Sequence, residues 1–409
     1  MSEGIKPASA KEVEQAVQWA LSAGKTLEVL AGGSRRAIGR PMQTDLTLDL
    51  SALTGITLYE PQELVLSARA GTPLAEIEAA LASKDQQLAF EPMDCAPILG
   101  GVAGAGTIGG ALASNLSGPR RIKAGAARDH FLGFTAVSGR GEAFKSGGRV
   151  VKNVTGYDLC KLMAGSWGTL AVLTDVILKT LPRPETEETV MIRGLEAPRA
   201  IGAMTSAMAS GCDVSGAAHL PVDAAAHLAS EVAGAGAAVT ALRLEGFALS
   251  VAHRKRVLSK ELRGFGEVSE LAAPASRGLW QAVRDVMPFA AAGDSDPRPL
   301  WRVSVPPSRG AELVAMIAKE VQADVLYDWA GGLVWLSLER RDDAGAAVIS
   351  GAVAATGGHA TLMRAAAATR AAADVFTRTG PALSALSKRV KESFDPKGVL
   401  NPGRMWAGV

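Results

Sequence analysis

The residues that could do chemistry first appear in a glycine-rich loop. Residues 31–39 read AGGSRRAIG and directly follow LEVL, an apolar run with the composition of a strand. Glycines allow successive backbone N–H groups to turn toward one point and form a nest for an anion. Ser34 adds a hydroxyl donor, and Arg35 and Arg36 add positive charge. The loop therefore suits a pyrophosphate, with a tight surface turn as the alternative.

A second glycine-rich segment, residues 101–118, reads GVAGAGTIGGALASNLSG. GAGTIG has the G-x-G-x-x-G spacing of a Rossmann dinucleotide site, with Asp129 downstream. We reject that site because the preceding residues, EPMDCAPILGG, hold two prolines in place of a buried strand, and because Asp129 precedes a strand instead of following one. The glycines, with Thr107, Ser114 and Asn115, still predict a helix start that faces phosphate or ribose.

A third segment, residues 146–182, mixes glycines with polar residues and then becomes an apolar strand. Its five glycines allow a close approach to a ligand and sharp turns. We expect Tyr157 and Asp158 to anchor the turn through hydrogen bonds. Residues 170–172 would present strand backbone groups to the edge of a purine.

The composition excludes several classes of protein. A net charge of +2 over 409 residues argues against a dedicated nucleic-acid binder. Three widely spaced cysteines, Cys95, Cys160 and Cys212, argue against a disulfide scaffold and against a zinc or iron–sulfur site, and favour reduced thiols in a cytoplasmic protein. The first residues lack a secretory signal, and no apolar run approaches the roughly 18 residues of a membrane span. We therefore expect only peripheral contact with the inner membrane, through partners.

The elements that must position these residues predict an α+β protein in two parts. Residues 10–23 form an amphipathic helix capped by Ser9, and FLGFTAVSGRGEAF is typical of a hairpin. PRPETEE, at residues 182–188, has the composition of a linker. Beyond it, strand-like runs alternate with amphipathic helices, which predicts an antiparallel sheet with helices on one face. We predict domains at 1–184 and 185–375, and a segment at 376–409 that returns to the first domain.

Four motifs in register carry a family resemblance: AGGSRRAIG, GTIGGALASN, VVKNVTGYDLCKLMAGSWGTLAVLTDVILKTLP and the tail FDPKGVLNPGR. Together they resemble the FAD-linked oxidases of the vanillyl-alcohol oxidase type, and more closely the FAD-binding subunits of bacterial glycolate oxidases. The resemblance implies a two-subdomain FAD-binding domain of the PCMH type, with an α+β antiparallel-sheet cap domain. It implies cofactor contacts from Gly32, Gly33, Ser34, Arg35, Thr107, Gly109, Gly110, Ser114, Asn115, Asp129, Val172 and Asn401. The FAD would be non-covalent, because the AGGSR loop has no His or Cys.

The resemblance also implies a multisubunit glycolate oxidase (glycolate dehydrogenase) that converts glycolate, a small 2-hydroxy acid, to glyoxylate. Its partners would be a larger catalytic flavoprotein subunit and an iron–sulfur subunit. This chain would hold a flavin for electron relay, or support the catalytic subunit.

The chain departs from the catalytic members of the family. Those acting on 2-hydroxy acids have a His-x-His cluster followed by Asp-Gly-Asn, whereas none of the five histidines here is separated from another by a single residue. No metal site is expected, and the catalytic residues are unknown. One alternative is a self-contained FAD-dependent 2-hydroxy-acid oxidase that holds its substrate through Arg302 or Arg364 and uses a tyrosine as base. Another is a non-catalytic scaffold subunit.

Overall fold

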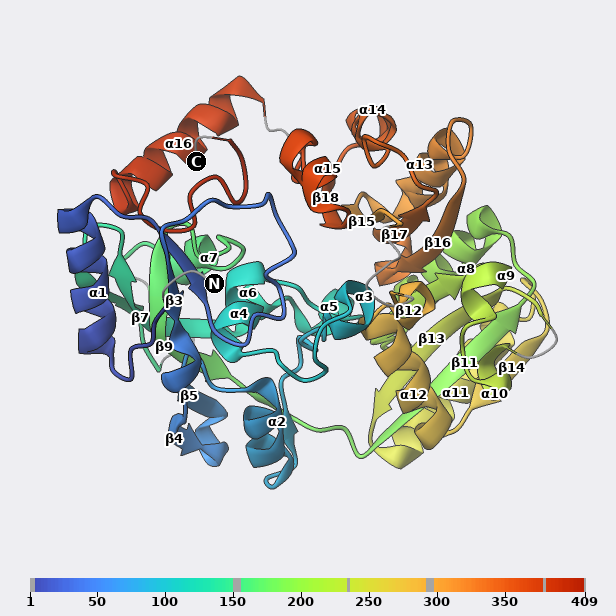
Figure 1. Cartoon of the computed structure of the whole chain (residues 1–409). Coiled ribbons are helices and arrows are strands. Elements are labelled where there is room, and N and C mark those ends of the chain that lie inside the picture. The colour runs from blue at the N-terminus through green and yellow to red at the C-terminus, as the bar shows by residue number, and fades with distance from the viewer. Residues whose placement is uncertain (1–3, 150–155, 234–235, 292–297, 378–379, 408–409) are drawn as a thin grey trace.

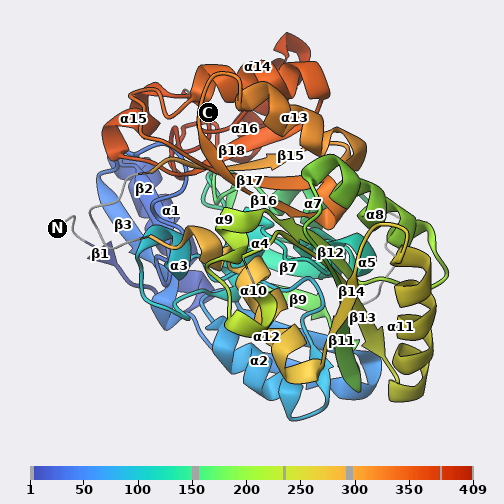
Figure 2. The ribbon, with the colours of Figure 1, turned by 90° about the vertical axis from the view of Figure 1, so that its right-hand side faces the viewer.

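The structure is a computed structural model of the whole chain and describes residues 4–149, 156–233, 236–291, 298–377 and 380–407. Figure 1 shows two lobes side by side, one built from the first part of the chain and the other from the middle part. The last helix, α16, lies against the first lobe. Figure 2 looks at the second lobe from outside, with its sheet crossing the view.

Three sheets build the first lobe. β1 (Gly4–Ile5), β3 (Leu46–Asp49) and β2 (Leu27–Leu30) pair in parallel, in that order. A five-stranded antiparallel sheet has the order β4 (Ile56–Glu60), β5 (Val65–Arg69), β9 (Ala171–Lys179), β7 (Phe131–Ser138), β8 (Ala143–Gly147). β6 (Gln86–Gln87) and β10 (Leu181–Pro182) form a two-stranded pair. The pairing of β7 with β8 confirms the hairpin predicted for FLGFTAVSGRGEAF.

The helices of the first lobe are α1 (Ala10–Ala23), α2 (Leu74–Ala82), α3 (Ala96–Leu99), α4 (Ile108–Ser114), α5 (Arg121–Ala124), α6 (Ala127–His130) and α7 (Leu159–Met163). α1 begins as predicted, because the Ser9 hydroxyl accepts the Glu12 N–H at 3.2 Å, and it ends at Gly24 in the left-handed conformation. Val13 and Val17 on its inner face are fully buried. The predicted helix is therefore confirmed at both ends.

An eight-stranded antiparallel sheet forms the second lobe, the cap. Its order is β14 (Val268–Leu271), β11 (Thr186–Arg193), β13 (Val239–Gly246), β12 (Gly216–Leu220), β16 (Ala323–Asp328), β17 (Leu333–Leu338), β15 (Leu300–Ser304), β18 (His359–Arg364). Among the described strands, those before residue 184 share no sheet with those after residue 185. The domain boundary at residues 184 and 185 stays a prediction.

Helices cover both faces of the cap sheet, which corrects the expectation of one covered face. The helices are α8 (Ala197–Ala209), α9 (Val222–Ala225), α10 (Ser230–Ala233), α11 (Ala248–Leu262), α12 (Ala273–Arg284), α13 (Gly310–Ile317), α14 (Ala346–Thr356) and α15 (Ala367–Ala372). Lys255 of α11 pairs with Glu188, whereas Trp280 of α12 donates to Thr189, the next residue of β11. Because successive side chains of a strand point to opposite faces, α11 and α12 lie on opposite sides of the sheet.

The chain returns to the first lobe at its end. α16 (Pro381–Phe394) is followed by a tail in which Leu400 bridges Leu27 of β2 in parallel. The Leu27 N–H donates to the Val399 carbonyl, and the Asn401 N–H donates to the Leu27 carbonyl. The tail thus extends the small parallel sheet, and this brings the residues after Asn401 to the glycine loops.

Candidate functional site

The predicted glycine segments converge on one cleft of about 770 Å³, including its open mouth. Residues 28–36, parts of 107–114 and parts of 167–173 line the cleft, together with Leu50, Ala70 and Arg404. Eight of the twelve predicted contact residues are in this lining: Gly32, Gly33, Ser34, Arg35, Thr107, Gly109, Gly110 and Ser114.

The loop that follows β2 offers unused backbone donors to the cleft. Within the described part of the chain, the N–H groups of residues 32–35 donate no hydrogen bond to the backbone or to a side chain. Gly33 has a φ of 69°, a conformation that disfavours other residues. At Gly32, a Cβ would lie only 1.8 Å from the Ala105 carbonyl oxygen, so the two glycine segments touch here. The loop therefore has the free amides and the glycines of an anion nest.

Helix α4 forms a wall of the cleft, but its first amides are already used. Thr107 caps the helix as predicted, since its hydroxyl accepts the Gly110 N–H. The two amides before it donate within the lobe, Ile108 to Thr72 and Gly109 to Ala70. The start of α4 consequently lacks the free donors that the sequence analysis expected for phosphate, and residues 32–35 have them instead. The Ser114 hydroxyl, which donates to the Gly110 carbonyl, has an oxygen that can still accept.

Two buried arginines add positive charge beside the cleft. Arg35 donates to the Met93 carbonyl at 2.9 Å, and Arg404 donates to the Arg35 carbonyl at 2.9 Å. The Nε atoms of both are buried and have no hydrogen-bond partner among the residues that the structure describes. Burial, with repulsion from Arg35, lowers the pKa of Arg404 to about 10. The two orphan donors are consistent with an anionic ligand in the cleft.

Sequence reasoning missed Arg404 and Trp167, which both line the cleft. The Arg404 guanidinium carbon lies 5.5 Å from the centre of the Trp167 ring. Both residues belong to motifs that carried the family resemblance, GSWGT and NPGR, but only Asn401 of the second motif was selected. The neighbouring Arg36 is different, because the Glu28 carboxylate accepts two hydrogen bonds from its guanidinium, at 2.7 and 2.5 Å, and neutralises its charge.

Four predicted contact residues lie outside the lining. Asn115 ends α4 and accepts the Arg128 N–H, and Asp129 accepts the Ala126 N–H. Val172 is fully buried, and its side chain belongs to the hydrophobic cluster that includes the buried residues of α1. Its neighbours Ala171 and Leu173 line the cleft. Asn401 is also fully buried, with its amide bonded to the backbone of Val29 and of Trp167. As cofactor contacts these four stay predictions, and the bonds of Asn401 give it a positioning role.

Tyr157 does not anchor its turn, since its side chain is 90% exposed. That expectation was wrong, because an aromatic residue in a glycine-rich motif was taken as a sign of burial. Asp158 does act as expected: it caps α7 by accepting the Lys161 N–H at 3.3 Å.

His130 and His219 form hydrogen bonds within their own lobes. His130 bonds the Ala124 carbonyl, and His219 bonds Thr240, with burial lowering the pKa of His219 to about 4. Across the described ranges, no three His, Cys, Asp or Glu side chains gather as a metal site would require. The guanidinium of Arg364 donates to the carbonyls of Ile98, Phe289 and Arg298. These bonds give Arg364 a structural role.

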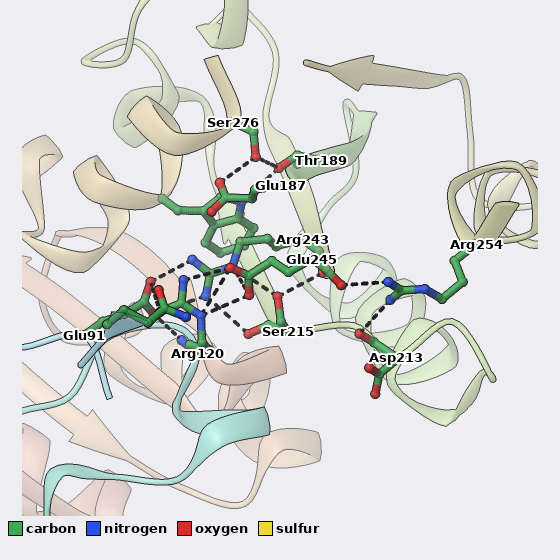
Figure 3. Close-up of polar contacts among 12 residues, drawn as sticks. Glu91, Arg120, Glu187, Thr189, Asp213, Ser215, Arg243, Glu245, Arg254 and Ser276 are labelled. Atoms are coloured by element: carbon green, nitrogen blue, oxygen red, sulfur yellow. Dashed lines mark hydrogen bonds and ion pairs between the residues drawn. The ribbon is translucent and has the colours of Figure 1, made fainter. Parts of the chain in front are cut away.

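A buried network of charges joins the cap to the first lobe (Figure 3). Glu91 accepts bonds from Arg243 of β13 at 2.8 and 3.1 Å and pairs with Arg120 at 3.2 Å, and Arg120 also forms a bidentate pair with Glu245. Burial alone would raise the pKa of Glu245, but Arg243 and Arg120 reverse this and lower it to about 2. The network therefore fixes the cap against the lobe that holds the cleft.

Comparisons with known proteins match this architecture. A family model described as "FAD binding domain" matches residues 4–147, and one described as "FAD linked oxidases, C-terminal domain" matches residues 369–405. The glycolate oxidase subunit GlcE of Escherichia coli is 35% identical over 97% of this chain and 96% of its own length. The chain belongs to the FAD-linked oxidase family. Within this family, the glycolate oxidase subunit GlcD of Bacillus subtilis is 42% identical over only 21% of the chain and 18% of its own length.

The fold of this FAD-linked oxidase is also that of a solved structure, p-cresol methylhydroxylase with substrate bound. The TM-score is 0.73 at 12% identity, over 99% of this chain and 88% of the other. The PCMH-type fold expected from the sequence is therefore confirmed. FAD is the cofactor of the family, and the cleft fits it: free loop amides and two orphan arginine donors suit a diphosphate. No described helix has both the length and the apolar composition needed to cross a bilayer.

Proposed function

We propose that this chain is the FAD-binding subunit of a multisubunit glycolate oxidase. The observation that carries the proposal is the 35% identity to GlcE, because it extends over nearly the whole of both chains. The match to GlcD covers a short segment only, which supports the assignment to a different subunit. The reaction of the complex would be the oxidation of glycolate to glyoxylate.

Different residues of the cleft would bind different parts of the cofactor. The amides of residues 32–35 and the hydroxyl of Ser34 would bind the diphosphate, with Arg35 and Arg404 balancing its charge. The wall formed by α4 and by Ala171 and Leu173 would border the nucleotide and exclude water. A bound flavin supplies two-electron chemistry and can release electrons singly. The protein would tune this chemistry through the charges and donors that it holds near the cofactor.

We propose a larger flavoprotein subunit and an iron–sulfur subunit as partners, in the cytoplasm or peripheral to the inner membrane. The chain would either relay electrons through its own flavin or hold the complex together. Both roles require stable association with the catalytic subunit, and the relay also requires bound FAD.

Co-expression of the three subunits tests the proposal. We expect the complex to co-purify, to carry flavin on this chain, and to reduce a dye with glycolate. Omission of this chain should abolish glycolate-dependent dye reduction. The proposal fails if the chain never associates with the other subunits, or if the two-subunit preparation keeps full activity.

A further inference from the structure

The cap sheet turns a charged face toward the first lobe. Directly paired residues of antiparallel strands share a face, and successive residues alternate. The pairs that carry this face across the sheet are Arg243 with Gly216, Leu326 with Trp335, Trp335 with Arg302, and Arg302 with Thr361. Between β12 and β16, His219 pairs with Tyr327 on the opposite face, so Gly216 and Leu326 share this one. Arg302 therefore lies on the same face as Arg243, which contacts the first lobe in Figure 3.

The two arginines on this face differ in their partners. Arg243 is bonded to Glu91 and lies 3.5 Å from Glu245. Arg302 is only 7% exposed, yet its guanidinium makes no hydrogen bond and no ion pair with any residue that the structure describes. Its nearest recorded neighbours are aromatic, with the guanidinium carbon 5.1 Å from the ring centre of Trp329 and 6.0 Å from that of Trp335. A buried charge that makes no hydrogen bond and no ion pair is costly, so an arginine in this state points to an anion that would bind it directly.

A second guanidinium comes to the same indole from the first lobe. The guanidinium carbon of Arg121, on α5, lies 4.3 Å from the ring centre of Trp329, and this side chain has no ion pair within the described ranges either. The indole N–H donates to the Gly118 carbonyl, which fixes the ring at the junction of the lobes. Burial, and then repulsion from Arg121, lowers the pKa of Arg302 to about 10. Asp328 attracts Arg302, but among the described residues it forms no ion pair with Arg302 or with Arg121.

We propose that Arg121 and Arg302 together bind one small carboxylate at the junction of the two lobes, beside Trp329. A guanidinium that lies over an aromatic ring keeps its N–H groups in its own plane, where they match a planar carboxylate bidentately. The strand β18 adds Thr361, paired with Arg302, and His359, paired with Ser304, on the same face. Arg302 is too deeply buried for the surface of another protein to reach it, so the ligand is a small acid and not a carboxylate of a partner subunit.

This site is distinct from the cofactor cleft. Gly118, which bonds Trp329, follows Ser114 of the cleft lining by four residues, and neither arginine is in that lining. The inference does not depend on the proposed glycolate oxidase function, because acetate tests it as well as glycolate does.

Isothermal titration of the purified full-length chain, with the flavin that it carries, tests the site. The probes are acetate, glycolate and inorganic phosphate at constant ionic strength, and the variants are Arg302→Gln and Arg121→Gln. Arg128→Gln is the matched control, since it removes an exposed arginine from the adjoining helix α6. We expect one saturable site for acetate or glycolate. Either variant should weaken it by about tenfold or more, as expected for a charged hydrogen bond, and the control by less than about twofold.

The thermal midpoint without ligand checks that each variant folds, and loss of an uncompensated buried charge should not lower it. If a variant fails to fold, the wild type alone still tests the site: its thermal midpoint should be higher in acetate than in chloride. The proposal is overturned by the absence of carboxylate binding, by binding that both variants retain, or by preference for phosphate. It is also overturned if the arginine variants lose only the association with a partner subunit.

Discussion

Nη1 of Arg243, in the middle of the cap sheet, lies 2.8 Å from Oε1 of Glu91 in the first lobe. The same carboxylate accepts the backbone N–H of Arg120 at 2.6 Å, and Arg243 also lies over the ring of Trp280. Arg243 and Arg120 lower the pKa of Glu91 against the opposing effect of burial, so Glu91 is ionised and paired. One carboxylate thereby connects the core of the cap to the lobe with the cofactor cleft.

Glu91→Gln should destabilise the protein by about 3–5 kcal/mol, because it leaves Arg243 and Arg120 with too little negative charge in a buried setting. Denaturant unfolding measures this loss. Glu63→Gln, at an exposed glutamate, is the control and should change stability by less than about 0.5 kcal/mol. The double variant Glu91→Met, Arg243→Met should be more stable than Glu91→Gln alone. Equal stability of Glu91→Gln and the wild type would show that this pair does not hold the cap.

Gly32→Ala should abolish or strongly weaken FAD binding. The added methyl group would overlap the Ala105 carbonyl at 1.8 Å, so the loop must move away from the second glycine segment and its free amides move with it. Flavin retained per chain after gel filtration, and FAD affinity by fluorescence quenching, measure the effect. Gly101→Ala is the control, since a Cβ at that exposed position has nothing within 4 Å. Equal flavin content in both variants would count against the loop as the diphosphate site.

Asp328→Asn should change how stability depends on pH. Burial raises the pKa of Asp328 from 3.8 to about 7, although the Trp329 N–H donates to its carboxylate. Between these two values the folded protein holds a proton that the unfolded chain has lost, so the contribution of Asp328 to stability falls as pH rises. Because asparagine does not titrate, the stability of the variant does not fall with pH in this way. The free energy of unfolding of the variant relative to wild type should rise by about 2–3 kcal/mol from pH 5 to pH 8.

Glu91 and Glu245 have pKa values lowered from 4.5, so their contributions to stability change with pH below this value and stay nearly constant from pH 5 to pH 8. The difference between variant and wild type therefore isolates Asp328. A difference that stays constant between pH 5 and pH 8 would refute the assignment.

The sequence predicted what depends on local patterns. Ser9 and Thr107 cap their helices, and the Gly32–Gly33 loop faces the cleft, because cap residues and glycines act on the backbone next to them. Trp280, Trp301, Trp329 and Trp335 are buried, as the large apolar area of an indole favours. Val172 shows the limit: the strand was correct, but which of its side chains reach the cleft depends on a one-residue alternation.

Long-range partners could not be predicted. Arg404 reaches the cleft only because the tail pairs with β2, and the partners of Glu91 are 29 and 152 residues away. Arg121 and Arg302 meet at Trp329 through the packing of two lobes, which leaves no pattern in the sequence. Sequence reasoning treated Arg302 as a guess for a carboxylate contact and did not select Arg121.

The C-terminal tail gives the last prediction. Asp395 is buried and accepts the N–H groups of Val399 and Leu400 together with Nζ of Lys391 at 2.7 Å. Lys391 in turn donates to the Thr169 carbonyl, in the segment that borders the cleft. Asp395→Asn leaves a buried ammonium without its counter-charge and should cost about 3–5 kcal/mol.

Because Asp395 orders the tail that carries Arg404, the same variant should raise the dissociation constant for FAD and speed amide exchange over residues 399–404. Glu392→Gln, at an exposed position on the same helix, is the control and should alter neither measurement. If Asp395→Asn lowers stability but leaves FAD affinity and tail exchange at wild-type values, the tail does not position Arg404. Loss of FAD affinity together with faster exchange at residues 399–404 would show that the cleft depends on a segment nearly 370 residues from its main loop, joined to it through Arg404 and the Arg35 carbonyl.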